Sequence, residues 1–173
     1  MTSPPLRVSP PPPGFARIRF VTQETSLFGR LIRWRTMSQV SHAECVLPNG
    51  TIIAALSDRS VRNVPGDYDT TSTSQIFVDV LMPPNDLKRW VAYLWSRVGR
   101  PYDWTAIYGE AMHLNWRAPC GFICSMLCAL SLREAGTFSR PLSEEAHKLS
   151  PRDVLLILSA HPAARIHPKE VRK

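Results

Sequence analysis

The sequence contains no apolar run that approaches the roughly 20 residues a transmembrane helix needs. Residues 1–14 also lack the apolar segment of a secretory signal peptide. We therefore expect a chain with no transmembrane segment that is made in the cytoplasm. We expect it to stay there or to leave the cell as part of an assembly, such as the tail of a phage virion.

Cysteine is scarce, with 4 residues in a chain of 173. So few cysteines fit free thiols in a reducing compartment better than a disulfide framework. Cys120, Cys124 and Cys128 recur at every fourth position, so a helix that began early enough would place them on one face. With Cys45 they offer four thiolates, but their spacing differs from the Cys-x-x-Cys knuckles of common zinc sites. We expect ordinary buried thiols there, with no metal and no cofactor.

The sequence also lacks zinc-finger spacing, a helix-turn-helix pattern and the aromatic motifs of RNA-binding domains. It is nevertheless basic, with a formal net charge of +7 and a pI near 9.7. Such a charge permits contact with nucleic acid, anionic lipid or an anionic cell-wall polymer. A solvated basic surface is the simpler interpretation, and we predict no specific nucleic-acid partner.

The composition indicates one folded domain between two unusual ends. Hydrophobic residues make up 44% of the chain and charged residues 20%, which is enough to build a core. Residues 1–14 form a proline-rich arm, residues 15–158 carry the folded part, and residues 159–173 form a basic tail, which we expect to be disordered from His161 onward. The arm and the tail are candidates for binding neighbouring proteins of an assembly.

Periodicity and turn residues predict a mixture of strands and helices. Asn49-Gly50 between two apolar runs is a strong hairpin signal. Strands are predicted over residues 15–21, 41–47, 51–56 and 75–82, and a polar surface loop over 66–74. Helices are predicted from residue 25 or 26 to 34, then over 85–98, 104–113 and 122–135, and again from 151 onward. Trp90 and Trp95 fall on the apolar face of their helix, where we expect both to be core residues.

The segment of residues 119–130 (PCGFICSMLCAL) predicts a turn that leads into a buried helix, with Cys124 in its first turn. Unpaired backbone N–H groups and the positive end of the helix dipole favour a thiolate there. His42 lies at the start of a predicted strand, and alternation places Glu44 on the same face. His42 is therefore the candidate base for Cys124, and Glu44 is the nearest group to orient the imidazole.

Two observations limit this interpretation. The Cβ atoms of residues two apart on a strand are about 7 Å from each other, so contact between His42 and Glu44 needs a bend or a bridging water. The alternative is that Cys124 is a small apolar core residue and that His42 bonds to an unrelated neighbour.

The order of the short motifs is similar to that of a known group of proteins. A predicted helix ending at Trp34 is followed by residues 41–44 (SHAE), 48–53 (PNGTII), 99–104 (GRPYDW) and 122–125 (FICS). This order resembles the circularly permuted papain-like group of the NlpC/P60 superfamily, in which the histidine strand precedes the cysteine helix. The resemblance covers residues 15–158 and implies a small α+β domain, with an antiparallel sheet packed on the helix that carries the cysteine.

The resemblance implies roles for particular residues. Cys124 matches the nucleophile and His42 the base. Tyr102 and Asp103 match a recurring Tyr-Asp-Trp segment, which implies a place near the substrate cleft. Many members carry a third polar residue about where Ala54 lies here, so Glu44 is left as the candidate for that role.

The function implied is that of a cysteine peptidase or amidase that attacks an amide bond. By analogy with the superfamily, the substrate would be a peptide crosslink of the bacterial cell wall, and the protein a phage or prophage tail component. The alternative is a papain-like module kept as a structural or assembly component. Ala54 favours that alternative, as does Met126, which replaces an acidic residue often found there; Cys124 and His42 favour the enzyme.

Overall fold

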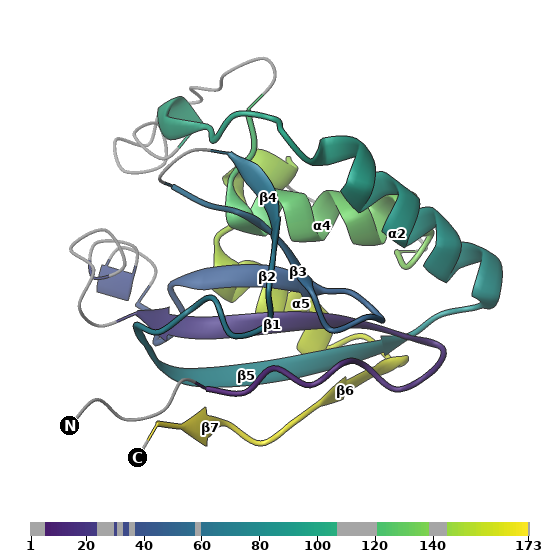
Figure 1. Cartoon of the computed structure of the whole chain (residues 1–173), viewed down its shortest axis with the longest axis horizontal. Helices are drawn as coiled ribbons and strands as arrows, with labels where there is room; N and C mark the ends of the chain where they lie inside the picture. Colours follow the sequence, from purple (N-terminus) through teal and green to yellow (C-terminus); the bar gives the residue numbers. More distant parts are fainter. Residues whose placement is uncertain are drawn as a thin grey trace.

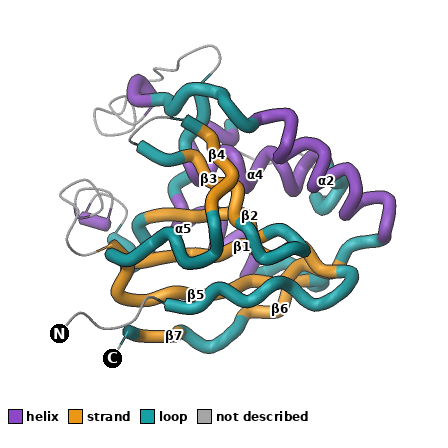
Figure 2. Tube along the Cα trace, in the orientation of Figure 1, coloured by secondary structure: helices purple, strands orange, loops and turns teal. Residues whose placement is uncertain are grey.

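The computed structural model describes residues 6–23, 30, 33–34, 37–57, 60–106, 121–138 and 145–172. Within these residues the fold is α+β, and the helices gather beside an antiparallel sheet (Figure 1, Figure 2). The elements in chain order are β1 (Phe15–Gln23), β2 (His42–Val46), β3 (Ile52–Ala55), β4 (Val61–Val64), β5 (Ser72–Leu81), α2 (Pro84–Arg97), α4 (Cys124–Glu134), the 3-10 turn η1 (Ala146–Lys148), α5 (Pro151–Ser159), β6 (Ala164–Ile166) and β7 (Glu170–Val171).

The sheet is built around the long strand β1. Its strand order is β4-β3-β2-β1-β5-β6, and β7 pairs with β5 beyond β6. All of these pairings are antiparallel. Strand β3 is in register with β2 at Cys45 and Val46, so the His42 end of β2 lies beyond this pairing.

Helices cover one face of the sheet. Strand residues that point to this face pack against α2 and α4, and Trp90 and Leu94 of α2 are fully buried with Leu132 of α4. The helix α4 packs against both β2 and β3. The predicted α+β fold, with an antiparallel sheet on the helix that carries the cysteine, is therefore confirmed at this level.

The opposite face of the sheet is covered by the two ends of the chain. Val8 of the arm packs against a second apolar cluster that includes Val46 and Phe77. The guanidinium of Arg17 donates to the carbonyl of Ser9, at 2.8 Å, and to both oxygens of the Asp79 carboxylate, at 2.6 and 2.8 Å. Figure 1 shows this N-terminal stretch running alongside β5 before it enters β1. The arm therefore packs on the chain's own sheet.

The tail differs from the expectation of disorder. Strands β6 and β7 both pair with β5, and His167 between them bonds to Asp79 through Nε2 at 2.8 Å. The prediction of disorder from His161 onward is therefore wrong for these strands. The edge of the folded sheet extends to the last described residues.

Local signals explain where several elements begin and end. Gly50 has φ of 82°, which the hairpin turn after Pro48 requires and which glycine adopts without strain. Helix α5 begins with a capping box, in which Ser150 accepts from the Asp153 amide and the Asp153 carboxylate accepts from Ser150. Most of the helix predicted from residue 25 or 26 to 34, and most of the one predicted over 104–113, lie outside the described residues; residues 30, 33 and 34 are described and are helical. In the described part of the chain, no helix has the length and apolar character needed to cross a membrane.

Candidate active site

Cys124 is the first residue of α4. The segment before it is fixed by pairing with residues 101–103: Tyr102 bridges Phe122, and the Asp103 amide donates to the Phe122 carbonyl at 3.1 Å. Gly121 makes this approach possible, since a Cβ there would lie 2.6 Å from the Cβ of Asp103. The cysteine is thus held at the helix start by a short, well-bonded turn.

The environment of Cys124 favours the thiolate. Burial alone would raise the pKa of the thiol, and only 3% of the residue is exposed. The positive charge and hydrogen bond of His42 outweigh burial, and the backbone N–H groups of Ala43 and Ser125 also point to the sulfur, so the pKa is lowered. The predicted proximity of Cys124 to His42 is therefore found in the structure.

His42 lies at the start of β2, opposite Val21 of β1. Burial lowers the pKa of its imidazole, but the negative charge of Cys124, its hydrogen bond and the carboxylate of Glu44 raise it to about 10. The two partners stabilise each other's charged form. The arrangement is that of a nucleophile–base pair, with Cys124 buried and His42 only slightly exposed.

Glu44 is the third member of the group. Its Oε1 atom lies 3.4 Å from Nε2 of His42, so the two side chains meet without a bridging water. The carboxylate is fully buried, which would raise its pKa, but the His42 contact, the charge of Arg19 and the hydroxyl of Tyr68 lower it to about 2. Glu44 is therefore ionised over the whole working range of the protein.

Two residues that the sequence analysis did not identify hold Glu44 in place. Arg19 donates from Nη1 to Oε2 of Glu44 at 3.0 Å, and the Tyr68 hydroxyl donates to Oε1. Arg19 is itself fully buried and donates from Nε to Gln75 at 2.8 Å. Arg19 lies directly opposite Glu44 on the neighbouring strand, and the β1–β2 register is what identifies it as a partner of Glu44. No spacing in the sequence points to Tyr68.

Tyr102 and Asp103 lie beside the cysteine turn, as described above. Asp103 is fully buried and accepts from the Ala106 amide at 2.9 Å and from the Thr105 hydroxyl at 2.7 Å. These contacts make it an N-terminal cap for the helical turn that begins at residue 104. A role for either residue in binding substrate stays a prediction.

Of the other thiols, Cys128 lies one turn further along α4 and Cys45 lies on β2. The sulfur atoms of Cys45 and Cys128 are 3.6 Å apart, and both residues are fully buried. The pKa of Cys128 is raised, chiefly by its hydrogen bond to Cys45 and by burial. Cys120 lies outside the described residues. Among the described side chains, no group of three or more His, Cys, Asp or Glu is placed to hold a metal ion.

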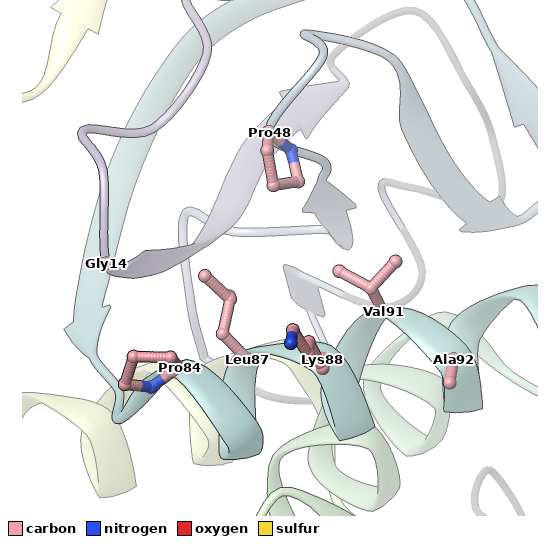
Figure 3. A pocket seen from close by; sticks show the side chains of 7 residues that line it. All are labelled: Gly14, Pro48, Pro84, Leu87, Lys88, Val91 and Ala92. Atoms are coloured by element: carbon pink, nitrogen blue, oxygen red, sulfur yellow. The ribbon is translucent and has the colours of Figure 1, made fainter.

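A separate apolar pocket lies between α2 and the two loops at Gly14 and Pro48 (Figure 3). Leu87 and Val91 of α2 point toward it, and Pro48 faces them from the hairpin turn. Its lining, as far as the structure describes it, includes none of the residues around Cys124. We therefore do not place the chemistry of Cys124 in this pocket.

Comparison with known proteins gives a similar fold. No family model matches the sequence, and no curated protein matches it. Among solved structures, the metalloprotein yiiX from Escherichia coli O157:H7, described as DUF1105, has a TM-score of 0.63. The match has 15% sequence identity and covers 92% of this chain and 98% of that chain. At this identity the likeness concerns the fold alone, and the described residues of this chain do not fit a resident metal.

Proposed function

We propose that this chain is a cysteine hydrolase of the permuted papain-like NlpC/P60 type, with Cys124 as nucleophile, His42 as acid and base, and Glu44 as the group that orients His42. The observation that supports this most is the buried Cys124–His42–Glu44 chain of contacts at the start of α4. Each member shifts the pKa of the next toward the charged form that the reaction needs.

The mechanism follows from these charges. The Cys124 thiolate attacks the carbonyl carbon of an amide, and backbone N–H groups at the start of α4 stabilise the oxyanion. The His42 imidazolium gives its proton to the leaving amine, and the C–N bond breaks to leave a thioester on Cys124. Neutral His42 then takes a proton from water as that water attacks the thioester. The acid product leaves, and the thiolate and imidazolium are restored.

The substrate class that we propose is a peptide amide of the bacterial cell wall. The support is the resemblance of the motif order to the superfamily, together with a net charge of +7 that suits anionic polymers. Delivery in a phage tail is part of the same proposal. The substrate class is tested by the turnover of purified cell-wall peptides, compared with turnover of a panel of simple amides and esters.

The first test concerns the thiol itself. With limiting iodoacetamide at neutral pH, we expect Cys124 to be alkylated well before Cys45 or Cys128, as measured by peptide mass spectrometry. His42→Ala should slow this labelling, because the imidazolium that lowers the thiol pKa is lost. His161→Ala is a matched control, since His161 bonds elsewhere, to the Thr137 carbonyl at 2.9 Å. Faster labelling of Cys45 or Cys128 would contradict the assignment.

A second candidate function is a structural or assembly module with the papain-like fold. The specific observation in its favour is that Cys124 is only 3% exposed, so a substrate would need access that the described residues do not show. The absence of a polar residue at Ala54 no longer supports it, because Glu44 contacts His42 directly. A chain without turnover on the whole panel, whose Cys124→Ala variant still supports assembly, would favour this candidate.

A further inference from the structure

One carboxylate oxygen faces two donors. Oε1 of Glu44 accepts from the Tyr68 hydroxyl and also lies 3.4 Å from Nε2 of His42. The other oxygen, Oε2, is held by Arg19 at 3.0 Å. The carboxylate therefore cannot turn to offer His42 a second, free oxygen without losing its contact with Arg19.

The two donors are not equally placed. The Tyr68 hydroxyl makes a close hydrogen bond to Oε1, whereas Nε2 of His42 is buried and lacks the alignment of a hydrogen bond to any described group. At 3.4 Å the contact between Nε2 and Oε1 is a charge interaction with an incomplete hydrogen bond. Tyr68 and His42 therefore share the negative charge of one oxygen, and Tyr68 makes the better hydrogen bond to it.

We propose that Tyr68 is a positioning residue that competes with His42 for Oε1 of Glu44, and thereby limits how strongly Glu44 holds the imidazolium. The inference deepens the proposed function and rests on it. Tyr68 touches neither the thiol nor the reacting carbonyl, so its effect passes through Glu44.

The competition matters because the two halves of the proposed reaction need different protonation states of His42. The first half of the reaction needs the imidazolium as an acid, but the second half needs neutral imidazole to take a proton from water. An undivided hydrogen bond to a buried carboxylate would hold His42 in its charged form and slow the second half. By sharing Oε1, Tyr68 keeps both forms of His42 accessible.

Tyr68 is suited to be a constant donor. Burial raises the pKa of its hydroxyl, and the negative charges of Glu44 and Asp69 raise it further, so the phenol stays protonated. Among the described residues, the charged or titratable groups around His42 and Glu44 are Cys124 and Cys128 from α4, Arg19 from β1, and the loop residues Tyr68 and Asp69. The experiment below leaves Arg19, Asp69 and Cys128 in place, so the sharing of Oε1 is what the replacement of Tyr68 changes.

The test is a direct titration of His42 by NMR, followed through its Cε1–H signal. It is done in the Cys124→Ser background, where the thiolate no longer contributes, and the signal is assigned by its loss in a His42→Ala variant. Adding Tyr68→Phe should raise the His42 midpoint by about half a unit or more, because Oε1 then gives its charge to the imidazolium alone. Tyr93→Phe, a partly buried tyrosine on α2, is the matched control and should leave the midpoint unchanged.

The same change is then made in a Glu44→Gln background, where the shared charge is absent. There Tyr68→Phe should have no effect on His42, since it acts only through Glu44. Incorporation of 3-fluorotyrosine at position 68 should shift the His42 midpoint in the opposite direction. Its hydroxyl is a stronger hydrogen-bond donor to Glu44 than that of tyrosine, so the His42 midpoint should fall. A purely structural role for Tyr68 would not produce opposite shifts from these two replacements.

The outcomes separate the two proposals. A His42 midpoint that falls or stays constant in Tyr68→Phe, with the fold intact by circular dichroism, overturns the competition. A shift of equal size in the Glu44→Gln background overturns its route through Glu44. Neither result depends on turnover. Failure of the proposed hydrolase would appear separately, as a wild-type Cys124 that alkylates no faster than Cys45.

Discussion

Replacement of Glu44 by glutamine tests the electrostatics of the site through the pH dependence of stability. Burial would raise the pKa of this carboxyl, but its contact with His42, the charge of Arg19 and the Tyr68 hydroxyl lower it from 4.5 to about 2. The folded state therefore favours the ionised form relative to the unfolded chain. Glu44→Gln removes the titrating group and keeps the shape of the side chain.

The size of the effect follows from the shift. Lowering the pKa from 4.5 to about 2 is a change of about 2.5 units, which corresponds to about 3 kcal/mol of unfolding free energy. This contribution is fully present above pH 4.5 and is lost as the pH falls through 2; about 2 kcal/mol of it is gone by pH 3. At pH 7 the glutamine variant should be less stable by about 3–5 kcal/mol, because the buried charge of Arg19 loses the nearer of its two carboxylate partners.

The assay is urea unfolding of both proteins at pH 7, 5, 4 and 3. The stability gap between wild type and Glu44→Gln should shrink by about 2 kcal/mol between pH 7 and pH 3. Glu134→Gln is the matched control, because Glu134 is an exposed residue at the end of α4. The difference in unfolding free energy between this variant and the wild type should stay near zero at all four pH values. Two parallel stability curves, with a constant gap at all four pH values, would refute the assignment of a buried ionised Glu44.

Three further predictions concern the scaffold. Asp79→Asn should loosen the C-terminal strands, since Asp79 binds both Arg17 and the tail, and amide exchange in β7 should speed up while exchange in α4 does not. Ser150→Ala should lower the unfolding free energy by about 1 kcal/mol in urea titrations, because it removes the capping box that Ser150 forms with Asp153. Leu94→Ala should cost about 2–5 kcal/mol in the same assay, since the side chain is fully buried; a loss under 1 kcal/mol would contradict the packing of α2 on the sheet.

Local signals in the sequence predicted the elements that carry the candidate site. The hairpin turn around Gly50 and the end of α2 at Gly99 each depend on residues within a few positions of each other. Gly50 and Gly99 take φ values of 82° and 87°, which few other residues adopt. The structure bears out these predictions because turn and cap chemistry needs little help from the rest of the fold.

Elements that depend on distant partners were not predicted. Strand β4 has the short sequence Val-Arg-Asn-Val and is stabilised by pairing with β3. Strand β5 begins at Ser72, inside the segment predicted as a surface loop, because β1 extends far enough to pair with it there. The basic tail likewise forms strands only because β5 offers it an edge. Composition alone contains no sign of these pairings.

Periodicity also failed at one end of α2. The apolar stripe predicted that both Trp90 and Trp95 are buried, but Trp90 is 0% and Trp95 45% exposed. Leu94, the residue before Trp95, is fully buried, so the packed stripe of α2 is narrower than the apolar stripe of the sequence. Helical spacing gives the face of a helix, but how much of that face is covered depends on the neighbouring elements.

The covered far face of the sheet explains why a strand pair can carry the buried charge of Glu44. In an antiparallel sheet with helices on one face, the other face is commonly exposed to solvent. Glu44 on a solvent-exposed face would have an ordinary pKa. Here Gln75 bonds through Nε2 to the arm, at the Arg7 carbonyl, and to the Glu170 carboxylate of β7. Gln75 also accepts from Arg19. The two chain ends therefore keep water from the Arg19–Glu44 pair, and the strong coupling of Glu44 to His42 depends on segments far from the cysteine helix in sequence.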